Sequence, residues 1–208
     1  MCNAARFPLM AQQTLKTRDK LIEIARQLFA KKGIENTTMN DIAAASDKGR
    51  RTIYTYFRNK RDIYNAVVKT ESDKIVEKLT QVLERLEPAE QKLMDFIFVR
   101  FECYKEAVLR NGSLRAGFFM DIRKVDRARR NTTAQEANIL KQILNEGVSQ
   151  GVFKVKHVEQ TAMVMILSLQ GLDVPYIRDS FAELGIEKLK LREYLKDFIL
   201  NGISNKQE

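Results

Sequence analysis

Apolar residues recur at helical spacing along most of the chain. The first run predicts a helix over residues 17–32, with Thr17 as its N-cap and Gly33 at its C-terminal end. No segment alternates apolar and polar residues as strands do. The pattern predicts further helices over 60–86 with an interruption at the polar stretch 70–73, from Pro88 to about 111–112, and over 114–125, 131–150, 157–176 and 186–203. The chain is therefore expected to be all-α.

Two short helices joined by a tight turn are expected soon after the first helix. Thr38 and Asp41 have the spacing of a capping box, and the small or apolar residues 42–45 follow them. Residues 46–49, Ser-Asp-Lys-Gly, supply turn residues before a helix over 50–57. This order predicts a helix-turn-helix.

The charge of the chain is concentrated in its first third. Residues 1–70 hold 14 Lys and Arg against 6 Asp and Glu, whereas the remainder holds 22 against 21. A polyanionic partner is expected for the first third, with nucleic acid as the first candidate and an anionic membrane surface as the second. The helix over 50–57 favours DNA, because its basic residues lie beside Thr and Tyr rather than opposite a wide apolar face.

These residues resemble the DNA-binding domain of the TetR family of bacterial transcriptional regulators. The resemblance covers residues 17–67 and is strongest over 52–60, Thr-Ile-Tyr-Thr-Tyr-Phe-Arg-Asn-Lys. It implies a three-helix DNA-binding domain followed by a helical domain for effector binding and dimerisation. The implied function is a DNA-binding repressor that a small-molecule effector releases from its operator.

The resemblance also implies which residues contact DNA. Arg50, Arg51 and Thr52 are expected nearest the base edges, and Tyr54 is either a phosphate contact or a packing residue. The full set of expected DNA contacts is Thr38, Lys48, Arg50, Arg51, Thr52, Tyr54, Thr55, Tyr56 and Lys60.

The turn departs from the family pattern. Asp47 stands where a turn Gly is usual and must adopt a left-handed conformation. Lys48 replaces an apolar residue, and Arg51 stands where the family commonly has Gly. An altered base preference is the expected consequence.

The second half of the chain is rich in Phe and Met, which predicts either an ordinary core or an adaptable ligand pocket. The resemblance favours the pocket, with candidate effector-binding residues Phe98, Phe101, Cys103, Tyr104, Phe118, Met120 and Met163. Within this half, Gly147 and Gly151 are expected to end the helix over 131–150, and Pro175 to interrupt the helix over 157–176.

The expected organisation is a flexible N-terminal arm over 1–16, a helix-turn-helix domain over 17–68 and a helical domain over 69–208. The arm either reaches DNA or makes no contacts. The resemblance implies a homodimer through the last two long helices, over 158–176 and 188–203. Apolar residues along 184–203 exceed what one helix face buries, which is compatible with a second buried face. A dimer predicts a near-palindromic operator.

Other classes of function find little support in the sequence. There is one His and no paired nucleophile and base, so neither an enzyme, a metal site nor a cofactor is expected. The longest apolar run, 162–167, is too short to span a membrane, and the expected location is the cytoplasm. Cys2 and Cys103 leave one alternative open, a thiol redox switch in place of a small-molecule effector, with Arg100 and Lys105 lowering the pKa of the thiol.

Overall fold

The structure is a computed structural model that describes the backbone of residues 6–111 and 122–203, and side chains over 16–111 and 130–201. The described residues form α-helices and two short 3-10 helices, without a β-strand. The chain divides into two compact units, Met1–Glu71 with Leu109–Val125, and Ser72–Val108 with Asp126–Glu208. The predicted all-α fold is therefore present. Most of the helix predicted over 114–125 lies outside the described residues.

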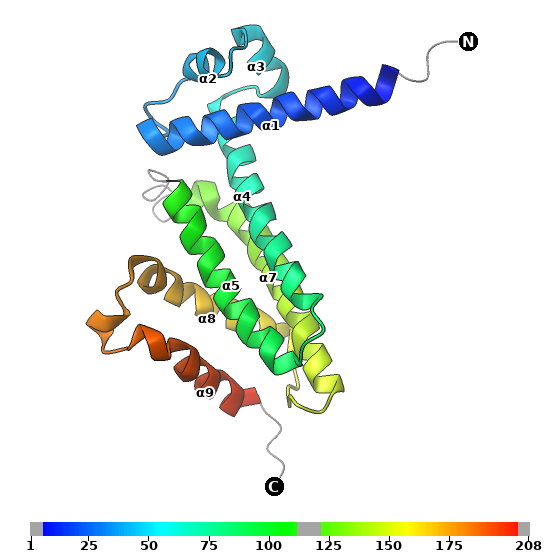
Figure 1. The fold of residues 1–208 in the computed structure, drawn as a ribbon, viewed down its shortest axis with the longest axis vertical. Coiled ribbons are helices and arrows are strands. Elements are labelled where there is room, and N and C mark those ends of the chain that lie inside the picture. The colour runs from blue at the N-terminus through cyan, green and yellow to red at the C-terminus, as the bar shows by residue number, and fades with distance from the viewer. Residues whose placement is uncertain (1–5, 112–121, 204–208) are drawn as a thin grey trace. The chain divides into compact units, whose positions relative to one another are not determined.

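The N-terminal unit contains α1 (Arg6–Lys32), α2 (Met39–Ala45), α3 (Arg50–Tyr56) and the beginning of α4 (Lys60–Leu83). In Figure 1, α2 and α3 lie side by side along α1. Their packing follows from the apolar stripe of each helix, because Phe29, Ile42 and Ile53 are each fully buried. The edge of the Phe29 ring meets Tyr64 of α4, with centroids 6.1 Å apart.

Helix α1 begins at Arg6, which differs from the expected arm over 1–16. Pro8 lies in the first turn, where its missing N–H has no intrahelical partner to lose. The residues after it, Leu-Met-Ala-Gln-Gln, are good helix formers. Sequence periodicity misses this extension because residues 6–16 have no regular apolar stripe.

The polar stretch 70–73 does not interrupt α4, and part of it forms a buried cluster in the N-terminal unit. Thr70 donates its hydroxyl to the carbonyl of Ala66, 3.0 Å away. The buried Glu71 carboxylate accepts hydrogen bonds from Arg110 (2.9 Å) and Asn111 (3.1 Å), at the end of α5 (Ala89–Arg110). The Arg110 carbonyl in turn accepts a hydrogen bond from Arg26 of α1, at 3.1 Å. We call these residues, Arg26, Glu71, Arg110 and Asn111, the Glu71 cluster.

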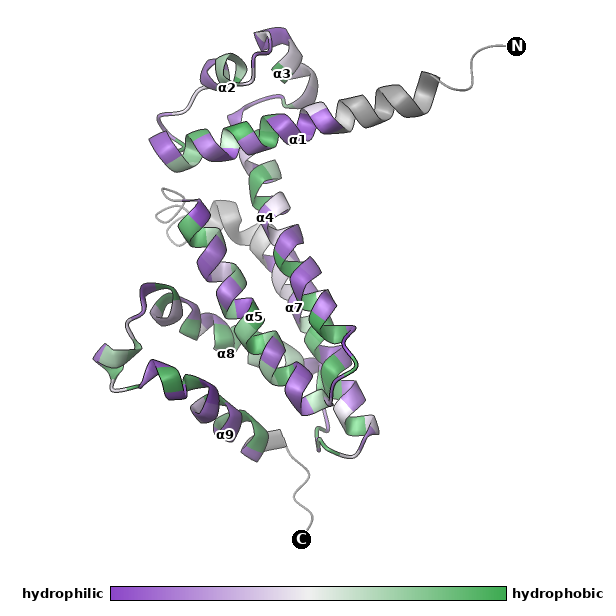
Figure 2. Ribbon diagram, in the orientation of Figure 1, coloured by the Kyte–Doolittle hydropathy of each residue, from purple (hydrophilic) through white to green (hydrophobic). Residues whose placement is uncertain are grey.

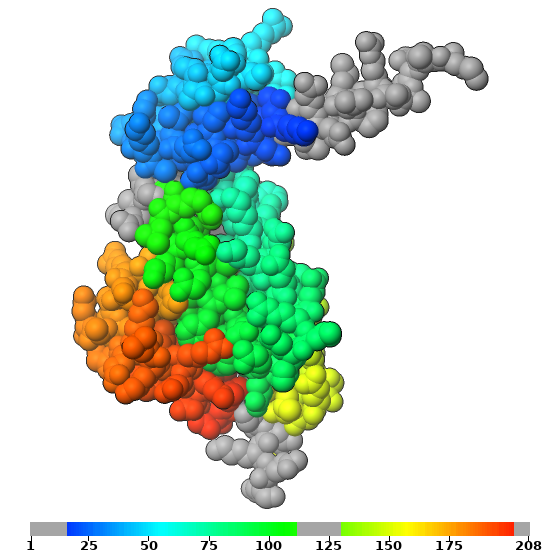
Figure 3. Space-filling view, viewed as in Figure 1, coloured from blue at the N-terminus to red at the C-terminus, as the bar shows by residue number. Residues whose placement is uncertain are grey.

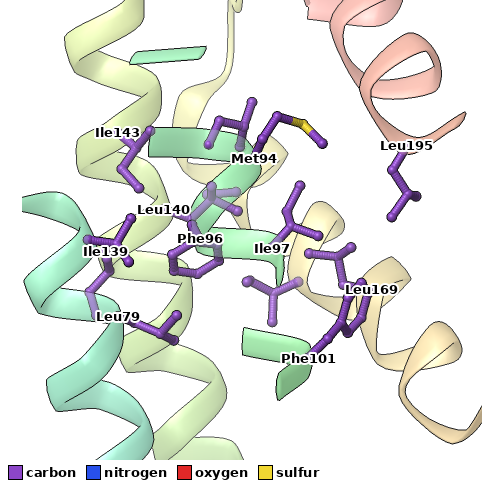
Figure 4. Packing of buried hydrophobic residues seen from close by; sticks show 14 of the residues in the cluster. Leu79, Met94, Phe96, Ile97, Phe101, Ile139, Leu140, Ile143, Leu169 and Leu195 are labelled. Atoms are coloured by element: carbon purple, nitrogen blue, oxygen red, sulfur yellow. The ribbon is translucent and has the colours of Figure 1, made fainter. Parts of the chain in front are cut away.

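The C-terminal unit is a helical bundle with one continuous core. Its elements are the second part of α4, most of α5, most of α7 (Ile122–Ser149), α8 (Val158–Arg178), the 3-10 helices Phe181–Leu184 and Lys188–Lys190, and α9 (Leu191–Ile203). The side chains labelled in Figure 4 come from α4, α5, α7, α8 and α9 and belong to one cluster of buried apolar residues. Figure 2 shows hydrophobic and hydrophilic residues alternating around α5 and α9, as expected for helices with one buried face.

Gly147 has a packing role that the sequence does not reveal. It was expected to end its helix, yet α7 continues to Ser149. A Cβ at Gly147 would lie 2.0 Å from the ring of Phe153, a buried residue of the core. Gly151, with φ of 74°, adopts the left-handed conformation expected just after a helix.

Pro175 does not interrupt α8, which continues to Arg178. Because Pro175 lies in the last turn, the helix loses one backbone hydrogen bond close to an end that frays in any case. The residue four positions earlier is the exposed Gly171, whose carbonyl water can reach.

A charged network lies buried in the C-terminal unit. Arg100 of α5 donates from Nε to Glu136 of α7 (3.0 Å) and from Nη1 to Asp173 of α8 (2.6 Å). Tyr104 donates its hydroxyl to the other Glu136 oxygen, 2.7 Å away. Arg100 and Glu136 are 0% exposed and Asp173 is 4% exposed. Burial raises the pKa of Glu136, because its charged form loses hydration.

Helices α8 and α9 also present apolar residues to solvent. On α8, Val164, Leu167 and Val174 share one exposed face with Gly171, and on α9 Tyr194 and Phe198 lie one turn apart. Phe198 is 81% exposed, whereas Leu191 and Leu195 of the same helix are buried. Figure 3 shows α9 (orange to red) on the outside of the C-terminal unit. Both helices thus have one apolar face in the core and a second one outside it.

Candidate DNA-binding surface and ligand pocket

Helix α2 begins with the predicted capping box. Thr38 accepts a hydrogen bond from the backbone N–H of Asp41 (3.1 Å), and the Asp41 carboxylate accepts one from the backbone N–H of Thr38 (2.8 Å). These hydrogen bonds hold the pKa of Asp41 below its usual value. Thr38 is exposed, but its hydroxyl hydrogen is given to Asp41 at 2.9 Å. While it keeps this hydrogen bond, Thr38 can contact a DNA phosphate only through a water molecule.

The turn between α2 and α3 has the geometry expected from its residues. Asp47 has φ of 53°, the left-handed conformation predicted for it. Lys48 is exposed, and its backbone N–H bonds to the carbonyl of Ala43 at 3.2 Å. Gly49 is the N-cap of α3. The departure of this turn from the family pattern therefore leaves a closed turn with its lysine in solvent.

One buried residue fixes the orientation of α3. Ile53 is 0% exposed and packs into the N-terminal unit. Arg51 and Thr55 stand two residues to either side of it, so each lies about 160° around the helix from Ile53. Both are exposed. They form the centre of the outward face, while Arg50 and Tyr54 lie on one flank and the half-buried Thr52 and Tyr56 on the other.

Contacts within α3 distinguish its two arginines. The Arg50 guanidinium lies over the ring of Tyr54, 5.6 Å from its centroid. Tyr54 is 41% exposed, so it is a surface residue rather than a packing residue. The hydroxyl of Thr55 donates to the carbonyl of Arg51 at 3.1 Å.

Lys60 makes contacts that its expected role does not include. Its ammonium group donates to the carbonyls of Ile34 (2.6 Å) and Glu35 (3.2 Å), in the turn after α1. One of its three N–H donors remains for a phosphate. Lys60 therefore fixes the turn after α1 whether or not it contacts DNA.

The sequence of this domain matches the family model described as bacterial regulatory proteins, tetR family, over residues 21–67. The N-terminal domain of this chain is therefore a TetR-type domain. A probable acrEF/envCD operon repressor of Escherichia coli is 47% identical to this TetR domain over 53 residues. That match covers 26% of this chain and 24% of the repressor, so it spans about a quarter of the relative's length.

Other transcriptional regulators match over most of the chain at lower identity. The uncharacterised regulator YhgD of Bacillus subtilis is 25% identical over 150 residues, which are 72% of this chain and 78% of that protein. A transcriptional regulator of Cytophaga hutchinsonii has a TM-score of 0.68 and 21% identity, over 89% of this chain and 97% of its own. A Saccharomonospora viridis regulator in complex with choline has a TM-score of 0.67 and 18% identity, over 92% of this chain and 99% of its own. These two structures show that the likeness in fold extends through the C-terminal unit.

The C-terminal unit contains an open pocket of about 580 Å³. Phe98, Val99 and Cys103 of α5 supply apolar lining, and Tyr176 comes from α8. The charged or polar lining residues are Lys78, Gln81, Arg85, Asp95, Glu102 and Arg192. Arg85 (3.0 Å) and Arg192 (2.6 Å) both bind the Asp95 carboxylate.

The predicted effector-binding residues have different positions. Phe98 and Cys103 line the pocket. Phe101 is buried behind it, stacked on Tyr176 with centroids 4.8 Å apart. Tyr104 belongs to the network of Arg100, and Met163 is exposed on α8, away from the pocket lining. Phe118 and Met120 lie outside the described residues.

Cys103 lacks the properties of a reactive thiol. It is 4% exposed. Burial raises the pKa of its thiol, although the charge of Lys78 acts in the opposite direction. Arg100 is already neutralised by two carboxylates, and the raised pKa of the buried thiol agrees with an unreactive Cys103. Cys2 lies outside the described residues.

Sequence reasoning missed the charged part of the pocket. Asp95, Phe98, Val99, Glu102 and Cys103 follow the i, i+3, i+4, i+7, i+8 spacing of one face of α5, and this spacing was the available signal. Arg85 and Arg192 have no such signal, because they come from beyond α4 and from α9. Among the described residues, no group of side chains forms a metal site and no helix is long and apolar enough to cross a membrane.

Proposed function

We propose that this TetR-family protein is a sequence-specific DNA-binding transcriptional regulator that represses transcription. The outward face of α3 carries this proposal, because arginines with hydroxyl and aromatic side chains lie on a helix-turn-helix in the basic third of the chain. The name of the Escherichia coli relative, an operon repressor, supports repression. The chain would regulate transcription by occupying an operator.

The DNA contacts divide into two groups. Arg50, Arg51 and Thr52 lie on the first turn of α3, which enters the major groove when a recognition helix docks by its N-terminal end. The remaining expected contacts lie on the second turn of α3 or beside this helix and would contact phosphates. These are Thr38, Lys48, Tyr54, Thr55, Tyr56 and Lys60.

The functional unit would be a homodimer formed through α8 and α9. The exposed apolar residues of these helices, including Leu167 and Phe198, form the surface that a second copy would cover. The exposed Gly171 has no atom within 4 Å of its Cβ position, which permits close approach of another helix. Two copies would present their α3 helices to a near-palindromic operator.

The pocket beside Phe98 would hold a small-molecule effector. Binding would favour a dimer whose α3 helices no longer match the operator. The support is the volume of the pocket and its partly apolar lining. The choline complex of the Saccharomonospora viridis regulator provides a precedent for ligand binding within this fold. The buried Cys103 gives no support to a redox switch in place of an effector.

DNA recognition is tested by selecting bound sequences from a random duplex pool. We expect a near-palindromic motif to be enriched. Lys48→Ala should weaken binding to all sequences equally and lower the slope of log K against log salt by about 1, since one phosphate contact is lost. Lys154→Ala removes the same charge from an exposed residue of the C-terminal unit and should leave the affinity for DNA and the salt slope unchanged. No enriched motif, or equal effects of both variants, would argue against the proposal.

Effector binding is tested by titrating a broad metabolite panel against the protein–operator complex. An active compound should raise the apparent Kd for DNA while the protein remains dimeric by sedimentation. A preference of about 3 kcal/mol for the released state corresponds to a roughly 150-fold change. Val99→Trp, which would fill the pocket, should retain DNA binding and lose the response. A response that persists in this variant would place the effector elsewhere.

A further inference from the structure

The two exposed residues opposite Ile53 differ in what they can offer a base pair. Among the described residues, the Arg51 side chain has no hydrogen-bond, ion-pair or ring partner, so all five of its N–H donors remain for a ligand. Arg50 is held over the Tyr54 ring on the flank of the helix. Arg51 is therefore the arginine that stands at the centre of the face that meets the groove.

Thr55 lies on the same line of α3 as Arg51, one turn further on. Its hydroxyl hydrogen is given to the Arg51 carbonyl at 3.1 Å, so the side chain presents mainly its methyl group. A threonine methyl makes apolar contact with the 5-methyl group of thymine, which lies in the major groove. This hydrogen bond moves Thr55 from the expected phosphate contacts to the base contacts.

The spacing of the two residues limits the distance between the bases they can read. Four residues of α-helix rise by about 6 Å. Successive base pairs lie about 3.4 Å apart along one strand. Two side chains on one line of a helix that follows the groove therefore reach base pairs one or two steps apart.

We infer that Arg51 specifies a guanine in each operator half-site and that Thr55 specifies a thymine one or two base pairs away. This inference rests on the proposed DNA-binding function and names the base pairs that it recognises. Arginine binds the O6 and N7 acceptors of guanine with two parallel N–H donors, an arrangement that no other base offers in the major groove.

The test uses the selected operator and duplexes that each carry one substituted base pair in both half-sites. For the wild type, one G·C pair should be required, with a roughly tenfold to hundredfold loss on substitution. Arg51→Ala should bind all four base pairs at that position with similar affinity and keep its other preferences. Arg51→Lys keeps the charge but loses the two-pronged fork, so it should also lose this preference. Arg50→Ala should weaken binding but retain the preference for G·C at this position, because Arg50 lies on the flank of the helix.

Thymine recognition is tested with deoxyuridine, which lacks only the 5-methyl group. Replacing the specified thymine should weaken the wild type severalfold and leave Thr55→Ser unaffected, because this variant has no methyl group to lose. All four variants are exposed substitutions, and circular dichroism melts should confirm that they fold like the wild type.

The outcomes separate this inference from the proposed function. An enriched operator whose G·C requirement survives Arg51→Ala, with binding weakened equally for every sequence, would make Arg51 a phosphate contact and overturn the inference alone. An operator without a required G·C pair would also overturn it. Failure of the wild type to enrich any sequence would contradict the DNA-binding function itself.

Discussion

Replacing Arg100 with Met should destabilise the C-terminal unit by about 3–5 kcal/mol, as removal of one partner from a buried ion pair does. Arg100→Met keeps most of the side-chain volume but leaves the carboxylates of Glu136 and Asp173 buried without their cation. Urea denaturation at pH 7.5, followed by circular dichroism, measures the loss. A midpoint close to that of the wild type would mean that water or another cation reaches the two carboxylates.

The loss of unfolding free energy caused by Arg100→Met should become smaller as the pH falls. Without the guanidinium, the pKa of Glu136 in the folded state, which burial already raises, rises further above its value in the unfolded chain. A raised folded pKa costs stability above that pKa, and the cost is relieved as the group takes up a proton at lower pH. The difference from the wild type should therefore be smaller at pH 5.5 than at pH 7.5.

Glu136→Gln is the matched variant for this network. It removes one negative charge but leaves Arg100 paired with Asp173 through two hydrogen bonds, of 2.6 and 3.1 Å. The remaining network is neutral, the amide oxygen can accept from Arg100, and the amide nitrogen can donate to the Tyr104 hydroxyl oxygen, which then no longer donates to residue 136. Glu136→Gln should thus lower the free energy of unfolding by much less than Arg100→Met does. Equal costs would show that the network is stabilised by its geometry alone rather than by its charge balance.

A double substitution, Leu167→Asp with Phe198→Asp, should produce a monomer and weaken operator binding by about 100-fold or more. The two residues are 54% and 81% exposed on α8 and α9, and carboxylates in their place would be buried by a second copy. A monomer contacts one half-site and loses the gain in affinity that two linked contacts provide. Sedimentation gives the mass, and a mobility-shift titration gives the affinity.

Leu86→Asp provides the control for this variant. Leu86 is another exposed leucine, in the turn after α4, and its replacement should change neither mass nor affinity. A Leu167→Asp, Phe198→Asp protein that stays dimeric would place the dimer interface on another surface. A monomer that binds the full operator as tightly as the wild type would mean that half-sites are read independently.

The helix-turn-helix could be predicted in detail because its signals are local. Thr38 and Asp41 are three residues apart, and their capping box appears where the spacing places it. The left-handed turn at Asp47 follows from the residues around it. The start of α1 could not be predicted in the same way, because residues 6–16 depend on intrinsic helix preference without an apolar stripe.

The C-terminal unit was less predictable because its chemistry depends on distant partners. Arg100 meets Glu136 and Asp173, which follow it by 36 and 73 residues, and no local pattern pairs them. In the sequence, Gly147 resembles a glycine that ends a helix. In the structure, the ring of Phe153 occupies the space where a Cβ would lie. The pocket likewise combines one face of α5 with arginines outside that helix. Such contacts follow from the tertiary fold and not from spacing.

The Glu71 cluster determines where this protein can be recombined with others. A junction just after Glu71 would keep every helix-turn-helix residue but remove Arg110 and Asn111, whose hydrogen bonds to Glu71 come from 39 and 40 residues further along. The buried carboxylate would then lose those donors, at a cost in stability. A chimera of this helix-turn-helix domain and a C-terminal domain from another protein would therefore have to include residues 109–111 or carry a substitution at Glu71. Modularity in this protein is therefore a property of the fold rather than of a contiguous stretch of sequence.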